Sequence, residues 1–213
     1  RDLRMSRGLG DVYKRQLVDK YVKAVESFKI DGISNPYYYT SHDPCYEYQV
    51  NDGCIKLYFP FRNKHTANRF ITNNKCPLEN LETLIDTNYK LIVKSQKDKL
   101  LMLRILKELR INDVGVYVIA SETAKLPDDI VDVLRKTTRI QAYVMLDTDN
   151  TGLTSAIEYE KNYGFIALFM TKGYSAKDPT DLVRITDYNF VKKKFANMYL
   201  NEIVNGKKGG VVP

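Results

Sequence analysis

The stretch AYVMLDTDNTG, residues 142–152, decides the fold class. Its first five residues are continuously apolar, which is typical of a strand that is buried on both faces. Asp147 and Asp149 follow directly, and residues 151–163 have the length and spacing of a helix that ends at Gly164. A buried strand followed at once by a helix predicts a unit of a parallel sheet.

The same alternation of apolar strands and helices continues on both sides of this stretch. It predicts an α/β fold with a parallel sheet of about four strands flanked by helices. We expect the other strands at residues 91–93, 114–120 and 165–170, and the other helices at residues 96–109, 127–135 and 187–204.

The chain before residue 88 has a different, loop-rich texture. Residues 17–30 place apolar side chains on one helical face, which predicts an amphipathic helix. Residues 54–61 alternate in the manner of a strand, and residues 69–72 predict a second one. We therefore expect a small α+β subdomain over residues 17–88.

Three further boundaries complete the expected organisation. Residues 1–16 have no helical or strand period and resemble translated adapter sequence, so we expect them to be a non-native extension. Residues 89–186 contain the α/β domain, and residues 187–213 contain a last helix with a basic tail.

Composition excludes several classes of protein. Of 213 residues, 44% are hydrophobic and 28% are charged, which is too apolar for a disordered chain. The net charge is +7, but residues 1–16 carry five basic and two acidic residues, so the remainder carries only +4. Charge alone therefore predicts no nucleic-acid partner.

Targeting and cysteine content predict a cytoplasmic protein. No stretch approaches the roughly 20 apolar residues of a membrane span, and no signal peptide is recognisable. Three cysteines are too few for a disulfide framework, so a reducing cytosol fits best. The irregular spacing of the cysteines and the two histidines predicts no zinc site.

The two aspartates after the 142–146 strand are the sharpest chemical signal. Ligands of open parallel sheets bind beyond the carboxyl ends of the strands. Two carboxylates placed there favour a hard cation such as Mg²⁺, because oxygen ligands suit it better than zinc. The alternative is a turn that caps the following helix, since Asp, Asn and Thr all suit that position.

Polar clusters follow the other three strands as well. Residues 94–98 (KSQKD), 121–123 (SET) and 177–181 (KDPTD) would all lie at the same edge of the sheet. Each alone is more typical of a turn, a solvated helix start or an exposed surface than of a functional site. Their agreement predicts that this edge is the functional one.

Residues 91–183 resemble a Toprim domain, the catalytic module shared by bacterial-type primases, topoisomerases and some nucleases. AYVMLDTDNTGLTSA is similar to the strand, DxD and helix of that family, and KDPTDLV resembles its later acidic segment. VYVIASETAKLPDDIVDVL resembles the primase segment that precedes DxD, and IKLYFPFRNKHTANRFITN resembles the stretch that precedes Toprim in primases. Over residues 44–183, the combination is most similar to primase-type proteins of phages.

The resemblance implies roles for the acidic residues. It implies that Asp147, Asp149 and Asp178 bind Mg²⁺ or Mn²⁺, and that Asp147 and Asp149 are catalytic. A lysine, Lys94, stands where the family has its catalytic glutamate, and Glu122 at the neighbouring strand end is the candidate replacement. The remaining positions that belong to the motifs are Asp98, Asp181 and Gly152.

The resemblance also implies a basic surface for nucleic acid. Arg62, Lys64 and Arg69 lie in the segment similar to the primase stretch, and we expect them to contact template or nucleotide. Lys94 and Lys97 would meet phosphates at the start of the helix that follows the first strand.

We expect a primase-like enzyme that synthesises RNA primers on single-stranded DNA during phage DNA replication in the bacterial cytosol. Its substrates would be ribonucleotides, and a replicative helicase is a candidate partner. One alternative is a Toprim nuclease. The other is a catalytically degenerate Toprim module that binds DNA or docks replication partners, and Lys94 motivates it because a lysine weakens a magnesium site.

Overall fold

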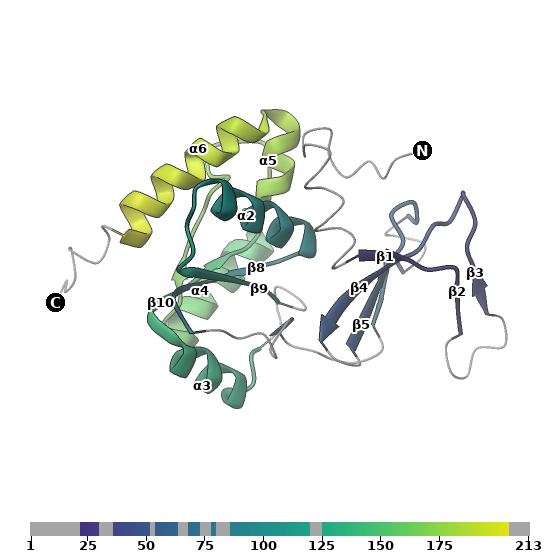
Figure 1. Cartoon of the computed structure of the whole chain (residues 1–213), viewed down its shortest axis with the longest axis horizontal. Coiled ribbons are helices and arrows are strands. Elements are labelled where there is room, and N and C mark those ends of the chain that lie inside the picture. Colours follow the sequence, from purple (N-terminus) through teal and green to yellow (C-terminus); the bar gives the residue numbers. More distant parts are fainter. Residues whose placement is uncertain are drawn as a thin grey trace. The chain divides into compact units, whose positions relative to one another are not determined.

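The computed structural model describes residues 22–29, 36–51, 54–63, 68–72, 78–79, 86–119 and 125–204. These residues form two compact units, with the boundary between Glu82 and Thr83. Helices and a parallel sheet make up the second unit, whereas the described part of the first unit consists of short strands and loops (Figure 1).

The second unit is built on parallel strands, which confirms the expected α/β fold. Neighbouring strands follow the order β11-β10-β8-β9, and each of these neighbouring pairs is parallel. The strands are β8 (Thr87–Val93), β9 (Val114–Ile119), β10 (Thr138–Met145) and β11 (Ile166–Ala167). β9 is continuously apolar and fully buried, as such a sheet requires, and β8 is buried at every position except Asn88.

Helices cover both faces of this sheet. The main apolar core holds Leu101 of α2, Leu182 of α5 and Val191 of α6, and these helices gather on one side of the sheet in Figure 1. Helices α3 and α4 bury apolar residues that are not part of this core, and they contact β10. The helices are α2 (Gln96–Glu108), α3 (Asp128–Thr137), α4 (Asn150–Tyr163), α5 (Pro179–Ile185) and α6 (Tyr188–Met198), followed by the π-helical segment η2 (Tyr199–Val204).

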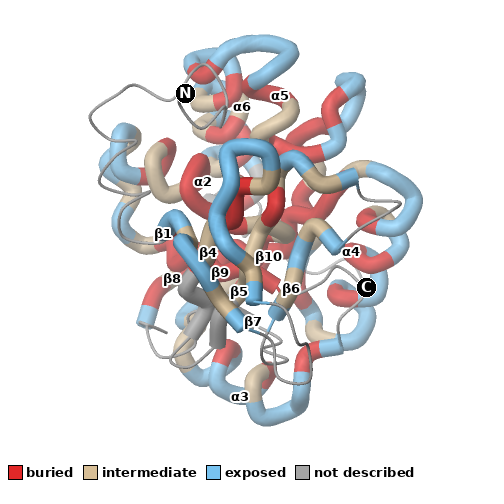
Figure 2. Tube along the Cα trace, turned by 90° about the vertical axis from the view of Figure 1, so that its right-hand side faces the viewer, coloured by how far each residue is buried: buried red, intermediate tan, exposed pale blue. Residues whose placement is uncertain are grey.

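Burial differs sharply between the helices. In Figure 2, α2 is largely buried, whereas most of α3 is exposed apart from Val131 and Leu134.

At the end of α4, Gly164 takes a left-handed conformation with φ of 71°, as expected for a helix C-cap. No helix in the described part of the chain is long and apolar enough to cross a membrane.

The first unit contains a four-stranded antiparallel sheet in the order β1-β4-β5-β6. A two-stranded antiparallel hairpin, β2 with β3, accompanies it. The strands of the sheet and the hairpin are β1 (Val22–Ala24), β2 (Ser27–Phe28), β3 (Tyr37–Tyr38), β4 (Tyr46–Asn51), β5 (Cys54–Tyr58) and β6 (Phe70–Thr72). The short strand β7 (Leu78–Glu79) belongs to neither.

The helix expected over residues 17–30 is wrong for the residues that the structure describes. Val22 pairs with Tyr48 of β4, and the Val25 amide donates to the Cys45 carbonyl at 3.0 Å. Valine and phenylalanine suit a strand at least as well as a helix. In so short a segment, the spacing of apolar residues does not distinguish the helical repeat from the alternation of a strand. A partner strand more than twenty residues away therefore decides the outcome.

Lys90 is fully buried in the middle of β8. Because Tyr89 and Leu91 belong to the main core, the alternation of a strand turns Lys90 toward the opposite face. Its ammonium lies 3.4 Å from the Thr87 hydroxyl and 5.2 Å from the centre of the Tyr117 ring. Burial lowers the pKa of Lys90 from 10.5 to about 8, although the charge of Asp86 opposes the shift.

This lowered pKa predicts that stability depends on pH. Between about pH 8 and pH 10.5 the unfolded chain keeps the Lys90 proton and the folded chain releases it, so the free energy of unfolding rises with pH. The rise is at most about 1.4 kcal/mol per pH unit. Urea unfolding at pH 7.5, 8.5 and 9.5 should show it in the wild type and not in Lys90→Met. Equal slopes in both proteins would contradict the prediction.

Candidate functional site

Asp147 follows β10 at the carboxyl edge of the sheet, and its side chain is completely buried. Two lysines from different loops hold the same carboxylate oxygen, Oδ2. Lys94, which follows β8, pairs with it directly, and the Lys177 ammonium lies 3.2 Å from it. The ammonium group of a lysine thus lies against this carboxylate, where the sequence predicted a metal ion.

Asp149 has a different environment from Asp147. It is exposed, and its side chain accepts a hydrogen bond of 3.0 Å from the Gly152 amide as the N-cap of α4. Gly152 is needed at this point because a Cβ there would lie 2.2 Å from the Asp147 carbonyl oxygen. The helix-capping alternative therefore describes what this carboxylate does in the structure.

Asp178 is the third predicted metal ligand, and it caps α5. Its Oδ1 accepts a hydrogen bond of 2.7 Å from the Asp181 amide, and its Oδ2 lies 2.5 Å from the Lys97 ammonium. Burial would lower the pKa of Lys97, but the charges of Asp98 and Asp178 outweigh it and raise that pKa. Lys97 therefore stays a cation beside this carboxylate.

Asp98 joins the starts of α2 and α5. Its carboxylate accepts hydrogen bonds from the Thr180 hydroxyl at 2.7 Å and from the Ser95 hydroxyl. Burial, followed by the negative charge of Asp178, raises the pKa of Asp98, while Lys97 opposes the shift. Asp98 thus holds the start of α2 and the start of α5 at a fixed spacing, and with them the charged residues Lys97 and Asp178.

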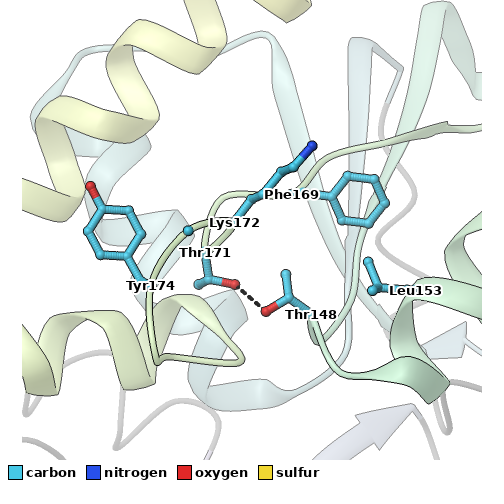
Figure 3. A pocket seen from close by; sticks show the side chains of 7 residues that line it. Thr148, Leu153, Phe169, Thr171, Lys172 and Tyr174 are labelled. Carbon is cyan, nitrogen blue, oxygen red and sulfur yellow. Dashed lines mark hydrogen bonds between the residues drawn. The ribbon is translucent and has the colours of Figure 1, made fainter.

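Thr148 connects the loop after β10 with the loop after β11. Its amide donates to the Lys177 carbonyl at 2.8 Å, and its hydroxyl lies 2.9 Å from the Thr171 hydroxyl (Figure 3). This pairing places the loops of Asp147 and Asp178 next to each other. Aspartates from two strands are thereby gathered at one edge, each with a lysine partner.

Three lysines thus face the acidic residues that the sequence singled out at this edge. Among the described residues, no three acidic, histidine or cysteine side chains are grouped closely enough to hold a metal ion. The carboxylates, as the structure arranges them, do not fit a divalent cation, because lysines already neutralise Asp147 and Asp178. Glu122 lies outside the described residues, and the magnesium site stays a prediction.

The predicted basic residues of the first unit are engaged within that unit. The Arg62 guanidinium pairs with Asp43 at 2.6 Å and lies 3.4 Å from the centre of the Phe59 ring. Arg69 donates to the Tyr58 hydroxyl at 3.1 Å. Lys64 lies outside the described residues. The template contacts expected of these three residues stay predictions, although Arg62 has an evident structural role.

Sequence reasoning missed two features of this edge. Lys177 was not singled out as a partner of Asp147, although it directly precedes the acidic pair in KDPTD. The contacts of Thr148 were also missed, because they depend on a loop more than twenty residues away. The spacing of residues along the chain carries no signal for either contact.

Comparison with known proteins identifies a fold and no family. No family model matches the chain, and no curated protein matches it either. The RNA polymerase domain of Mycobacterium tuberculosis primase DnaG, solved in complex with double-stranded DNA, is structurally similar with a TM-score of 0.53 and 10% sequence identity. The similarity covers 80% of this chain and 57% of that chain. This chain therefore has a primase-like fold and spans little more than half the length of that domain.

Proposed function

We propose that this chain is a primase-like protein of DNA replication, and that the carboxyl edge of its parallel sheet binds the phosphates of single-stranded DNA or of nucleotides. The observation that carries the proposal is the set of lysines at this edge of a primase-like fold. Lys94 and Lys177 come from the loops after β8 and β11, and Lys97 comes from the first turn of α2. A Toprim-like site would have an acidic edge without lysines on its carboxylates, whereas here three lysines lie against Asp147 and Asp178.

The exposed lysines of this edge are the ones available to an anion. The Lys177 side chain is 54% exposed and that of Lys97 is 40% exposed, although both also pair with aspartates. Lysine binds phosphate as a point charge and does not need the planar geometry of a guanidinium. The similar primase domain was solved with double-stranded DNA, which supports nucleic acid as the ligand class.

We expect Lys177→Gln to weaken the binding of a fluorescein-labelled single-stranded oligonucleotide about fivefold, as measured by anisotropy. The slope of log K against log salt should fall in magnitude by about 1, because one phosphate contact is lost. Lys161→Gln is the matched control, since Lys161 is exposed near the other end of α4. Unchanged affinity in Lys177→Gln, with an unchanged melting temperature, would contradict the proposal.

Mg²⁺-dependent primer synthesis is the second candidate function. The backbone hydrogen bond between Thr148 and Lys177 favours it, because this bond holds the loops of Asp147 and Asp178 together at the edge. In this function Asp147, Asp149 and Asp178 would be the metal ligands, with Glu122 as a further carboxylate. The lysines that now pair with Asp147 and Asp178 would have to withdraw.

Labelled ribonucleotides distinguish the two functions on the same single-stranded DNA. Incorporation that needs Mg²⁺ or Mn²⁺ and is lost in Asp149→Asn would establish primer synthesis. Asparagine caps a helix as well as aspartate does, so this variant should keep its fold. Binding without incorporation or cleavage would leave the binding function alone.

A further inference from the structure

A cavity of about 370 Å³ lies beside the loop that carries Asp147 and Asp149. Its volume falls in the range of small-molecule sites, which are mostly apolar with a few placed polar groups. Residues from three loops or helix starts build it: Thr148, Leu153, Phe169, Thr171, Lys172 and Tyr174, with Gly173 as the remaining lining residue.

The lining combines aromatic rings with hydroxyl groups. In Figure 3, Phe169 and Leu153 lie on one side and Tyr174 on the other, with the Thr148 and Thr171 side chains between them. The two threonine hydroxyls lie 2.9 Å apart and are also close to the Lys177 carbonyl. A flat ring with polar edges fits such a lining, because its faces contact the aromatic groups and its edge meets the hydroxyls.

The charges around the cavity are positive. Lys172 lines it, and the Lys194 ammonium lies 4.9 Å from the centre of the Tyr174 ring. None of the seven described residues that line the cavity is acidic. The neighbouring carboxylates are engaged, Asp147 with lysines and Asp149 with the amide of Gly152. The cavity therefore suits an aromatic ligand that carries an anionic group.

We propose that this cavity binds the base of a nucleotide whose phosphate lies on the lysines of the sheet edge. The inference rests on the proposed function, which supplies the phosphate contact, and it adds a site for the base. A hydrogen bond between two loops joins the two parts, since the amide of Thr148, which lines the cavity, donates to the carbonyl of Lys177 at 2.8 Å. Every base has an aromatic face, so recognition by stacking is tolerant of sequence.

The fluorescent base 2-aminopurine tests this proposal in the full chain. One probe is 2-aminopurine riboside 5′-triphosphate, and the other is a single-stranded oligodeoxynucleotide that contains one 2-aminopurine. Stacking in the cavity should quench the fluorescence of at least one probe. Phe169→Leu and Tyr174→Leu should each weaken its binding about tenfold, because stacking on an aromatic side chain is lost. Quenching of the first probe alone indicates a free nucleotide, and quenching of the second indicates a strand.

Controls separate failure of this inference from failure of the proposed function. Ile157→Ala changes an exposed apolar residue of α4 outside the cavity and should leave both probes unaffected. Oligonucleotide binding that is sensitive to Lys177→Gln but insensitive to Phe169→Leu and Tyr174→Leu would overturn the base site and keep the phosphate edge. Absence of any binding would overturn both. Melting temperatures within 2 °C of the wild type, as a rough limit for an intact fold, are required of each variant.

Discussion

Gly152→Ala is expected to lower the free energy of unfolding by at least about 3 kcal/mol. A Cβ at this position would lie 2.2 Å from the carbonyl oxygen of Asp147 and 2.8 Å from its carbonyl carbon. These are backbone atoms at the end of a buried strand, so no side chain can rotate away to make room. The start of α4 would have to move away from the loop and take the cap at Asp149 with it.

Gly164→Ala is the matched control for this prediction. Gly164 has φ of +71° but open space around its Cβ position, so alanine there meets only backbone strain of about 1–2 kcal/mol. Urea unfolding of both variants should therefore rank Gly152→Ala as clearly the more destabilised. If the two variants lose equal stability, close contact at Gly152 does not hold the loop and helix together.

The second unit was predictable because its signals are local. The apolar run at residues 114–119 predicts a buried strand of about that length. The helical spacing of apolar residues at 96–108 likewise predicts both a helix and its extent. The fourth strand is the exception: residues 165–170 predicted it, but only Ile166–Ala167 pair with β10. The chain then turns, and Phe169 and Thr171 line the cavity.

For the candidate site, the sequence could predict which edge of the sheet each residue lies at, because the topology of a parallel sheet determines that. Parallel strands bring their carboxyl ends to one edge, so Asp147, Asp178 and Lys94 could be assigned to that edge from the sequence. Which cation neutralises Asp147 could not be predicted, because that depends on the direction of lysine side chains from two distant loops. In the first unit, Val22 pairs with Tyr48, a partner distant in sequence, and local periodicity predicted a helix there instead.

Lys94→Glu is the variant that most directly tests the role of lysine at this edge. It removes a cation from a fully buried carboxylate and adds an anion beside it, so in EDTA the protein should lose about 3–5 kcal/mol of stability. Mg²⁺ should then restore stability, because a cation between the two carboxylates replaces the ammonium. At a Mg²⁺ concentration a hundredfold above its Kd, the gain is about 2.7 kcal/mol.

The wild type should respond to Mg²⁺ far less, since Lys94 and Lys177 already neutralise Asp147. Lys94→Gln is the matched control: it loses the same ammonium without adding a carboxylate, so Mg²⁺ should not rescue it. Thermal melts of the three proteins in EDTA, in Mg²⁺ and in NaCl of equal ionic strength measure the difference. Equal Mg²⁺ stabilisation of wild type and Lys94→Glu would mean that lysine does not occupy the place of a metal ion, and would favour primer synthesis over binding alone.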